Sequence, residues 1–106
     1  MAWTMLIIAG LFEIVWAFTL KQSDGFTKLI PSVITIVAMI ISFVLLALSM
    51  RTLPLGTAYT VWTGIGAIGA FVIGIAFLGE HLSFVRVCAA LLIISGLLLM
   101  KLSTPA

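Results

Sequence analysis

The sequence predicts an all-α membrane protein with four transmembrane helices in a single domain, 1–106. Hydrophobic residues make up 64% of the chain and charged residues only 8%, against roughly 25% charged residues in an average soluble domain. The few charges separate long apolar runs, and the segments 29–50, 52–79 and 87–100 carry no charge. Because a bilayer-spanning helix needs about 20 apolar residues, these runs predict membrane spans. The composition excludes a soluble globular domain and a disordered chain.

The first span is expected at about 2–20 and the second at about 29–50. The turn-forming residues 22–25 end the first span. A cleaved signal peptide is not expected, because no basic segment precedes the apolar run and Glu13 interrupts it. Pro31 lies just inside the start of the second span, where its missing N–H costs little.

The third span is expected at about 55–78 and the fourth at about 83–100. Pro54 precedes the third span and Gly79 ends it. Arg86 lies about one turn into the fourth span, from where its side chain can reach the membrane interface. The connections between the spans are too short for a soluble catalytic module, so no enzymatic activity is expected. Residues 103–106 are expected to fray.

The positive charges are balanced between the two sides of the predicted bundle. One side carries Lys21, Lys28 and Arg86, and the other carries Arg51, Lys101 and the N-terminal amine. Lysine and arginine near helix ends normally set membrane orientation. Two interpretations stay open: the orientation is simply hard to predict, or the chain inserts in both orientations and the two forms pair. The net charge of +2 is too small to suggest a nucleic-acid partner.

Glu13 is the one ionisable residue well inside a predicted span. A charge there costs a few kcal/mol or more, and an intramembrane acid is by default a functional-site hypothesis. A neutral carboxyl group that hydrogen-bonds between helices is the structural alternative. Since burial penalises the charged form of a carboxyl group, such a group can hold a proton or a cation, but not both well. We therefore predict proton-coupled cation exchange at Glu13, with no metal or cofactor.

Aromatic and hydroxyl side chains accompany this acid. Trp16 follows Glu13 on the same helix face, and Tyr59 and Trp62 form a similar pair in the third span. Aromatic faces attract desolvated cations, although aromatic residues also anchor helices at membrane interfaces. Ser42, in the second span, is either a site residue or a hydroxyl that bonds its own helix backbone.

Small residues indicate where the helices approach one another. Gly10 shares a face with Glu13, and Gly64 and Gly66 are a plausible bend in the third span. In the fourth span Ala89, Leu92 and Gly96 repeat near heptad spacing, which predicts a dimerisation helix. Four helices with one acid leave a half-built site, whereas a homodimer places two Glu13 side chains in one chamber. An antiparallel dimer also supplies the inverted repeat that alternating access commonly uses.

Several segments together resemble the small multidrug resistance family, and within it the guanidinium exporter subtype. They are Gly10–Ala17 (GLFEIVWA), Gly25-Phe26-Thr27, Pro31-Ser32 and Leu53–Ala67 (LPLGTAYTVWTGIGA). The resemblance covers essentially the whole chain. Thr60 departs from the usual alanine, and the Glu80-His81 loop varies in the family; we attach no function to either.

The resemblance implies an antiparallel, dual-topology homodimer in the bacterial inner membrane that exports guanidinium against protons. It implies that Glu13 binds both substrate and proton, with Trp16, Ser42, Tyr59 and Trp62 around it. We expect Trp16 and Ser42 to hold the Glu13 carboxyl group in position by hydrogen bonds, and Tyr59 and Trp62 to line the chamber. The residue that matches Trp16 is usually small in the family's polyspecific branch, so tryptophan favours the guanidinium branch. Met39 and Phe43 are expected to form a lipid-facing portal or to be ordinary lipid contacts. The alternatives are a polyspecific exporter of quaternary ammonium cations and a non-transporting membrane subunit.

Overall fold

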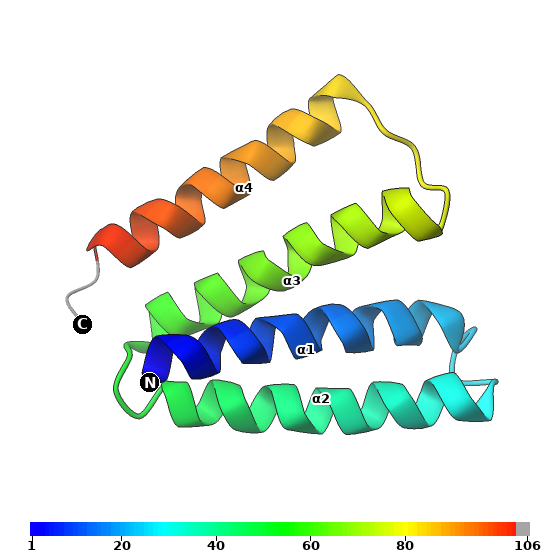
Figure 1. Ribbon diagram of the computed structural model, residues 1–106, viewed down its shortest axis with the longest axis horizontal. Coiled ribbons are helices and arrows are strands. Elements are labelled where there is room, and N and C mark those ends of the chain that lie inside the picture. The colour runs from blue at the N-terminus through cyan, green and yellow to red at the C-terminus, as the bar shows by residue number, and fades with distance from the viewer. Residues whose placement is uncertain (104–106) are drawn as a thin grey trace.

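The computed structural model describes residues 1–103 as four helices joined by short connections (Figure 1). The helices are α1 (Ala2–Gln22), α2 (Leu29–Ser49), α3 (Leu55–Phe77) and α4 (Phe84–Ser103). Each is long and apolar enough to cross a membrane, which confirms the predicted all-helical fold class. Residues 104–106, most of the segment expected to fray, lie outside the described residues, while Ser103 is the last residue of α4.

Helix α1 is the centre of the bundle. It packs against α2 and α3, whereas α4 packs mainly against α3, on the far side of α3 from α1 (Figure 1). The N-terminus, the last turn of α4 and the α2–α3 connection lie at one end of the molecule, and the α1–α2 and α3–α4 connections lie at the other. We call these the terminal end and the loop end. Helix α4 is peripheral, and it contains no buried residue.

The connections at the loop end use the left-handed backbone region. Asp24, Gly25 and Phe26 have φ angles of 50°, 72° and 66°, and Gly79 has a φ of 67°. Positive φ is uncommon outside glycine, with aspartate among the more tolerant residues. The buried Ser23 side chain stabilises the first turn, because its hydroxyl accepts a hydrogen bond from Phe26 N at 3.1 Å. The chain therefore reverses direction in the six residues between α1 and α2.

Buried hydroxyls mark the face of α2 that meets α1. Thr35, Ser42 and Ser49 recur at seven-residue spacing and are fully buried. The Thr35 hydroxyl lies 2.7 Å from that of Thr19 on α1, so a hydrogen bond joins the two helices near the loop end. Interhelical hydrogen bonds of this kind contribute to packing where lipid offers no hydrophobic driving force.

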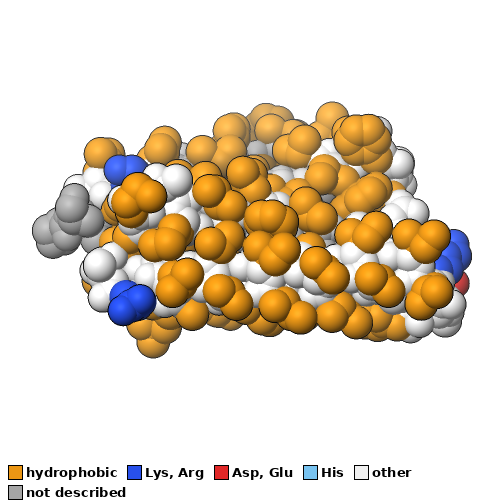
Figure 2. All heavy atoms as spheres, turned by 60° about the horizontal axis from the view of Figure 1, so that its bottom comes forward, with side chains coloured by type: hydrophobic (Ala, Val, Ile, Leu, Met, Phe, Trp, Pro, Cys, Tyr) orange, Lys and Arg blue, Asp and Glu red, His pale blue; other side chains and the backbone are white. Residues whose placement is uncertain are grey.

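The surface is apolar along the helices and charged at the ends. Figure 2 shows basic side chains at both ends of the molecule, with hydrophobic side chains between them. The buried hydrophobic core is small, consisting of Leu6, Ala9, Leu46, Leu53, Ala58, Val61 and Trp62. Most other large apolar side chains on α2 and α4 are exposed. A helical protein with this distribution suits a lipid environment rather than water.

Candidate functional site

Glu13 lies between α1 and α3, against the backbone of Gly66. A Cβ atom placed on Gly66 would overlap the Glu13 carboxyl group. One turn earlier on α1, a Cβ on Gly10 would approach Ile65 Cγ2 to 2.6 Å. The carboxyl atom Oε1 is buried and has no hydrogen-bond partner among the described residues. The two glycines thus let α1 and α3 approach closely, and the Glu13 carboxyl group is packed between the two helices.

Trp16 follows Glu13 by one turn and carries a second buried polar atom. Its indole Nε1 has no hydrogen-bond partner within the described part of the chain. Buried polar atoms in proteins are nearly always paired. An acceptor on Glu13 and a donor on Trp16 are therefore available, on one stretch of α1, to a ligand or to a second chain.

Four aromatic rings from three helices form a continuous row. The Trp16 and Phe43 ring centroids are 6.3 Å apart, in a T-shaped arrangement. Phe43 and Trp62 are 5.6 Å apart, and Trp62 and Tyr59 are 5.7 Å apart. The structure therefore brings together the predicted aromatic site residues, and it uses Phe43 as the link between α1 and α3. The ring faces in such a row suit a desolvated cation.

Ser42 joins three helices through hydrogen bonds. Its hydroxyl donates to the Ala9 carbonyl at 2.7 Å and accepts from Trp62 Nε1 at 2.9 Å. The alternative that Ser42 bonds its own helix backbone is therefore wrong. Ala9 lies four residues before Glu13, so Ser42 contacts the backbone turn that leads to the acid.

Within one chain, Trp16 and Ser42 do not hydrogen-bond the Glu13 carboxyl group as predicted. The single Ser42 hydrogen goes to the Ala9 carbonyl, and Trp16 Nε1 has no partner among the described residues. In this chain Ser42 can position Glu13 only through the α1 backbone.

The two glycines of the expected bend face different helices. A Cβ on Gly64 would overlap Leu97 on α4, whereas one on Gly66 would overlap Glu13 on α1. Helix α3 runs through both as one helix. In this structure the pair thus serves close packing on two sides of α3, and the expected hinge stays a prediction.

The remaining predicted residues lie at the periphery. Met39 is half-buried, and Phe43 is 46% exposed. The predicted dimer residues Ala89, Leu92 and Gly96 are all exposed, and a Cβ on Gly96 would meet nothing within 4 Å. An apolar groove of about 470 Å³ separates α3 from α4 and includes Tyr59, Gly64 and Gly96 in its lining. The portal and the dimer helix stay predictions.

Two features were not foreseen from the sequence. The first is the direct contact between Gly66 and the Glu13 carboxyl group, because the sequence predicts Gly66 as a small packing residue or a bend and not as a neighbour of the acid. The second is the Thr19–Thr35 hydroxyl pair. The seven-residue spacing of Thr35, Ser42 and Ser49 was the available signal for a polar seam on α2.

Comparison with known proteins gives a consistent result. The family model described as "Small Multidrug Resistance protein" matches residues 1–102. The "Guanidinium exporter" proteins of Citrobacter freundii and Salmonella typhimurium are each 57% identical over 104 residues, covering 98% of this chain and 99% of the relative. The "Guanidinium exporter" of Escherichia coli (strain K12) is 55% identical with the same coverage.

These relatives are named as exporters, which are transporters rather than enzymes. The resemblance found in the sequence is thereby confirmed. Together with the four apolar helices, the match makes this chain a multi-pass protein of the bacterial inner membrane.

Proposed function

Because the chain belongs to the small multidrug resistance family, we propose that it exports guanidinium across the inner membrane in exchange for protons. The name of its relatives supports the substrate. The observation that carries the proposal is Glu13, whose carboxyl group is buried between α1 and α3 with an unpartnered oxygen among the described residues. Burial penalises the charged carboxylate, so protons and a cation compete for the same group.

The chemistry around Glu13 suits guanidinium in particular. Guanidinium is planar, stays protonated and is more weakly hydrated than an ammonium ion. Its paired N–H groups match a carboxylate in a bidentate arrangement, and the aromatic row from Trp16 to Tyr59 offers ring surfaces to its face. A quaternary ammonium ion has no N–H to donate, so it leaves a hydrogen-bonding site unpaired.

The working unit of the proposal is an antiparallel, dual-topology homodimer. A single chain supplies one intramembrane carboxyl group, whereas two chains supply two Glu13 side chains to a common chamber. Three features support this arrangement: the unpartnered atoms on Glu13 and Trp16, the unburied helix α4, and the equal basic charge of the two ends. Ala89, Leu92 and Gly96 on α4 are the proposed dimer contacts.

The proposed cycle alternates between two protons and one guanidinium ion at the paired Glu13 side chains. Trp16, Tyr59 and Trp62 line the chamber, and Ser42 holds Trp62 against the α1 backbone. Met39 and Phe43 face the lipid as a portal. The protomers then exchange conformations, and the chamber opens to the opposite side. Two protons against one monovalent cation make the exchange electrogenic, so an imposed membrane potential should alter its rate.

The test is guanidinium uptake into proteoliposomes driven by a proton gradient, with Glu13→Gln as the control. Uptake that requires Glu13 and that a bulky aromatic cation inhibits only weakly supports the proposal. Uptake of the aromatic cation itself moves the protein to the polyspecific branch. If neither cation moves and the purified chain forms no dimer, the proposal fails in favour of a non-transporting subunit.

A further inference from the structure

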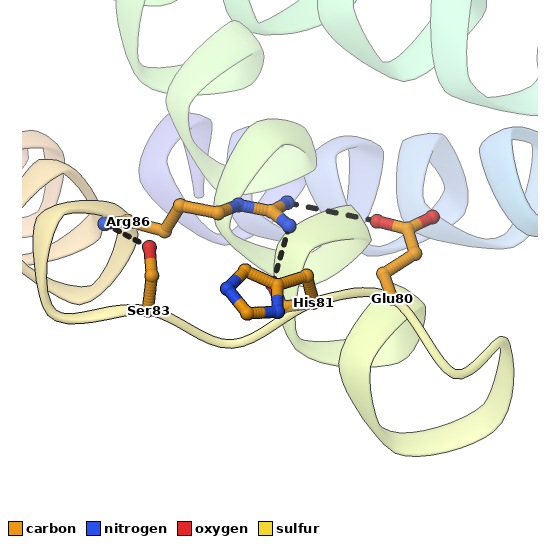
Figure 3. Close-up of polar contacts among 4 residues, drawn as sticks. All are labelled: Glu80, His81, Ser83 and Arg86. Carbon is orange, nitrogen blue, oxygen red and sulfur yellow. Dashed lines mark hydrogen bonds and ion pairs between the residues drawn. The ribbon is translucent and has the colours of Figure 1, made fainter.

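The loop end carries a cluster of polar contacts that the proposed transport cycle does not use. Figure 3 shows the Arg86 side chain reaching back from α4 toward Glu80 and His81 of the α3–α4 connection. Arg86 Nη2 lies 3.6 Å from Glu80 Oε1, and Nη1 donates a hydrogen bond to the His81 carbonyl. The Arg86 guanidinium carbon lies 5.3 Å from the centroid of the Phe71 ring on α3.

Glu80, the His81 carbonyl and the Phe71 ring are the kinds of group that bind a guanidinium ion. A carboxylate supplies charge and hydrogen-bond acceptors, a carbonyl supplies a further acceptor, and an aromatic face covers the planar cation. The occupant in this structure is the chain's own guanidinium group, on Arg86. The amide of Glu80 donates to the Gly74 carbonyl at 3.0 Å, and a Cβ on Gly74 would approach Glu80 Oε1 to 2.5 Å. The carboxylate is thus held against the last turns of α3.

Glu80 also lies at the outer end of the seam between α1 and α3. It lines a pocket of about 110 Å³ together with Ala17, Lys21 and Ala70, among others. Ala17 follows Glu13 by one turn of α1, and Ala70 follows Gly66 by one turn of α3. Lys21, at the outer end of this seam, lies about 12 Å along α1 from Glu13 at 1.5 Å per residue. Glu80 therefore lies near the outer end of the same helix pair that buries Glu13.

We propose that Glu80, the His81 carbonyl and the Phe71 ring form an outer guanidinium site, which Arg86 occupies in this conformation and leaves when free guanidinium binds. The inference rests on guanidinium being the transported cation. Displacement is feasible because the Arg86 and Glu80 side chains are 40% and 43% exposed, and exposed ion pairs are weak. The site concentrates substrate at the mouth of the α1–α3 seam.

The first test compares substitutions on the two sides of this ion pair in proteoliposomes at constant ionic strength. Glu80→Gln should raise the KM for guanidinium about two- to fivefold, the range expected for one exposed charge pair, with kcat unchanged. Arg86→Gln should lower the KM, because the tethered competitor is gone. A merely structural ion pair predicts changes in the same direction for both variants, and that result would overturn the proposal.

Asp24→Asn is the matched control for charge. Asp24 lies at the same loop end, outside the cluster, with a φ of 50° that asparagine also tolerates. A KM increase as large as that of Glu80→Gln would mean that any acid at this end attracts the cation, which also overturns the specific site.

A binding measurement separates this inference from the transport proposal. In full-length Glu13→Gln protein in nanodiscs, guanidinium chloride should shift the aromatic NMR signals of Phe71, and tetramethylammonium chloride at equal ionic strength should not. Adding Glu80→Gln should abolish the shift. If Phe71 does not respond, the outer site is excluded, whatever the outcome of guanidinium transport through Glu13.

Discussion

Replacing Ser42 with alanine removes the side chain that joins α1, α2 and α3 by hydrogen bonds. The variant loses the 2.7 Å bond to the Ala9 carbonyl and the 2.9 Å bond from Trp62 Nε1. Leaving a buried donor unpaired costs about 1–3 kcal/mol, while interhelical hydrogen bonds in a membrane protein average about 0.6 kcal/mol each. We therefore expect Ser42→Ala to lower the free energy of unfolding by about 1–3 kcal/mol.

The assay is unfolding of the purified protein in mixed micelles with increasing sodium dodecyl sulfate, followed by circular dichroism. A double-mutant cycle with Trp62→Phe isolates the bond between Ser42 and the indole, and its coupling energy should be about 0.6–1.7 kcal/mol. Ser32→Ala is the control, because Ser32 is on the same helix and donates to the carbonyl of Lys28 in its own first turn. Its effect should stay within about 0.5 kcal/mol.

The same variant tests whether Ser42 acts on Glu13 through the α1 backbone. Because Ala9 lies one turn before Glu13, loosening this turn should also slow guanidinium transport. A coupling energy near zero, together with a Ser42→Ala effect no larger than that of Ser32→Ala, would refute the three-helix connection.

Two further predictions concern the neighbours of Glu13. Gly66→Ala should place a methyl group against the Glu13 carboxyl group. This overpacked contact should lower the free energy of unfolding by about 1–3 kcal/mol and reduce guanidinium uptake in proteoliposomes. Gly56→Ala is the control, because Gly56 has open space around it, and it should change neither quantity; equal effects of the two variants would contradict the close contact. Trp16→Ala should make a bulky aromatic cation a stronger inhibitor of guanidinium uptake, because the smaller side chain leaves room for it. The concentration of that cation needed for half-inhibition should fall about tenfold, and an unchanged inhibition curve would remove Trp16 from substrate selection.

Much of the fold was predictable because lipid imposes simple constraints on the sequence. Charges and turn formers must lie at helix ends, so the expected first span, 2–20, falls within α1, which ends two residues later at Gln22. Helix α4 continues past the expected fourth span, 83–100, to Ser103. Lys101 continues α4, and its amine lies 4.9 Å from the Trp3 ring centroid.

The candidate site was predictable as a set of residues but not as a set of contacts. Glu13 stands out because an acid inside an apolar run is rare, and helical spacing identifies Trp16 and the Tyr59–Trp62 pair. The partner of the Ser42 hydroxyl could not be deduced, because it depends on how α1 and α2 are rotated about their axes. Phe43 looked like a lipid contact, yet its ring lies between Trp16 and Trp62.

Two independent features of the single chain, the uncovered helix α4 and the unpaired polar atoms on α1, are both explained by a dimer. Helix α4 buries no residue, although its two basic side chains already lie over the rings of Phe71 and Trp3. Those contacts fix the ends of α4 and leave the middle of the helix, with Leu92 74% exposed, open to a partner.

On α1, Glu13 and Trp16 each hold a buried polar atom without a partner among the described residues. Lipid can cover the apolar helix but cannot hydrogen-bond those atoms. A second copy of the chain can bury the helix and enclose a chamber in which guanidinium donates to the Glu13 carboxyl group and an acceptor of the second copy pairs with the Trp16 N–H. The proposed dimer therefore accounts for more of the structure than a lipid-covered monomer does.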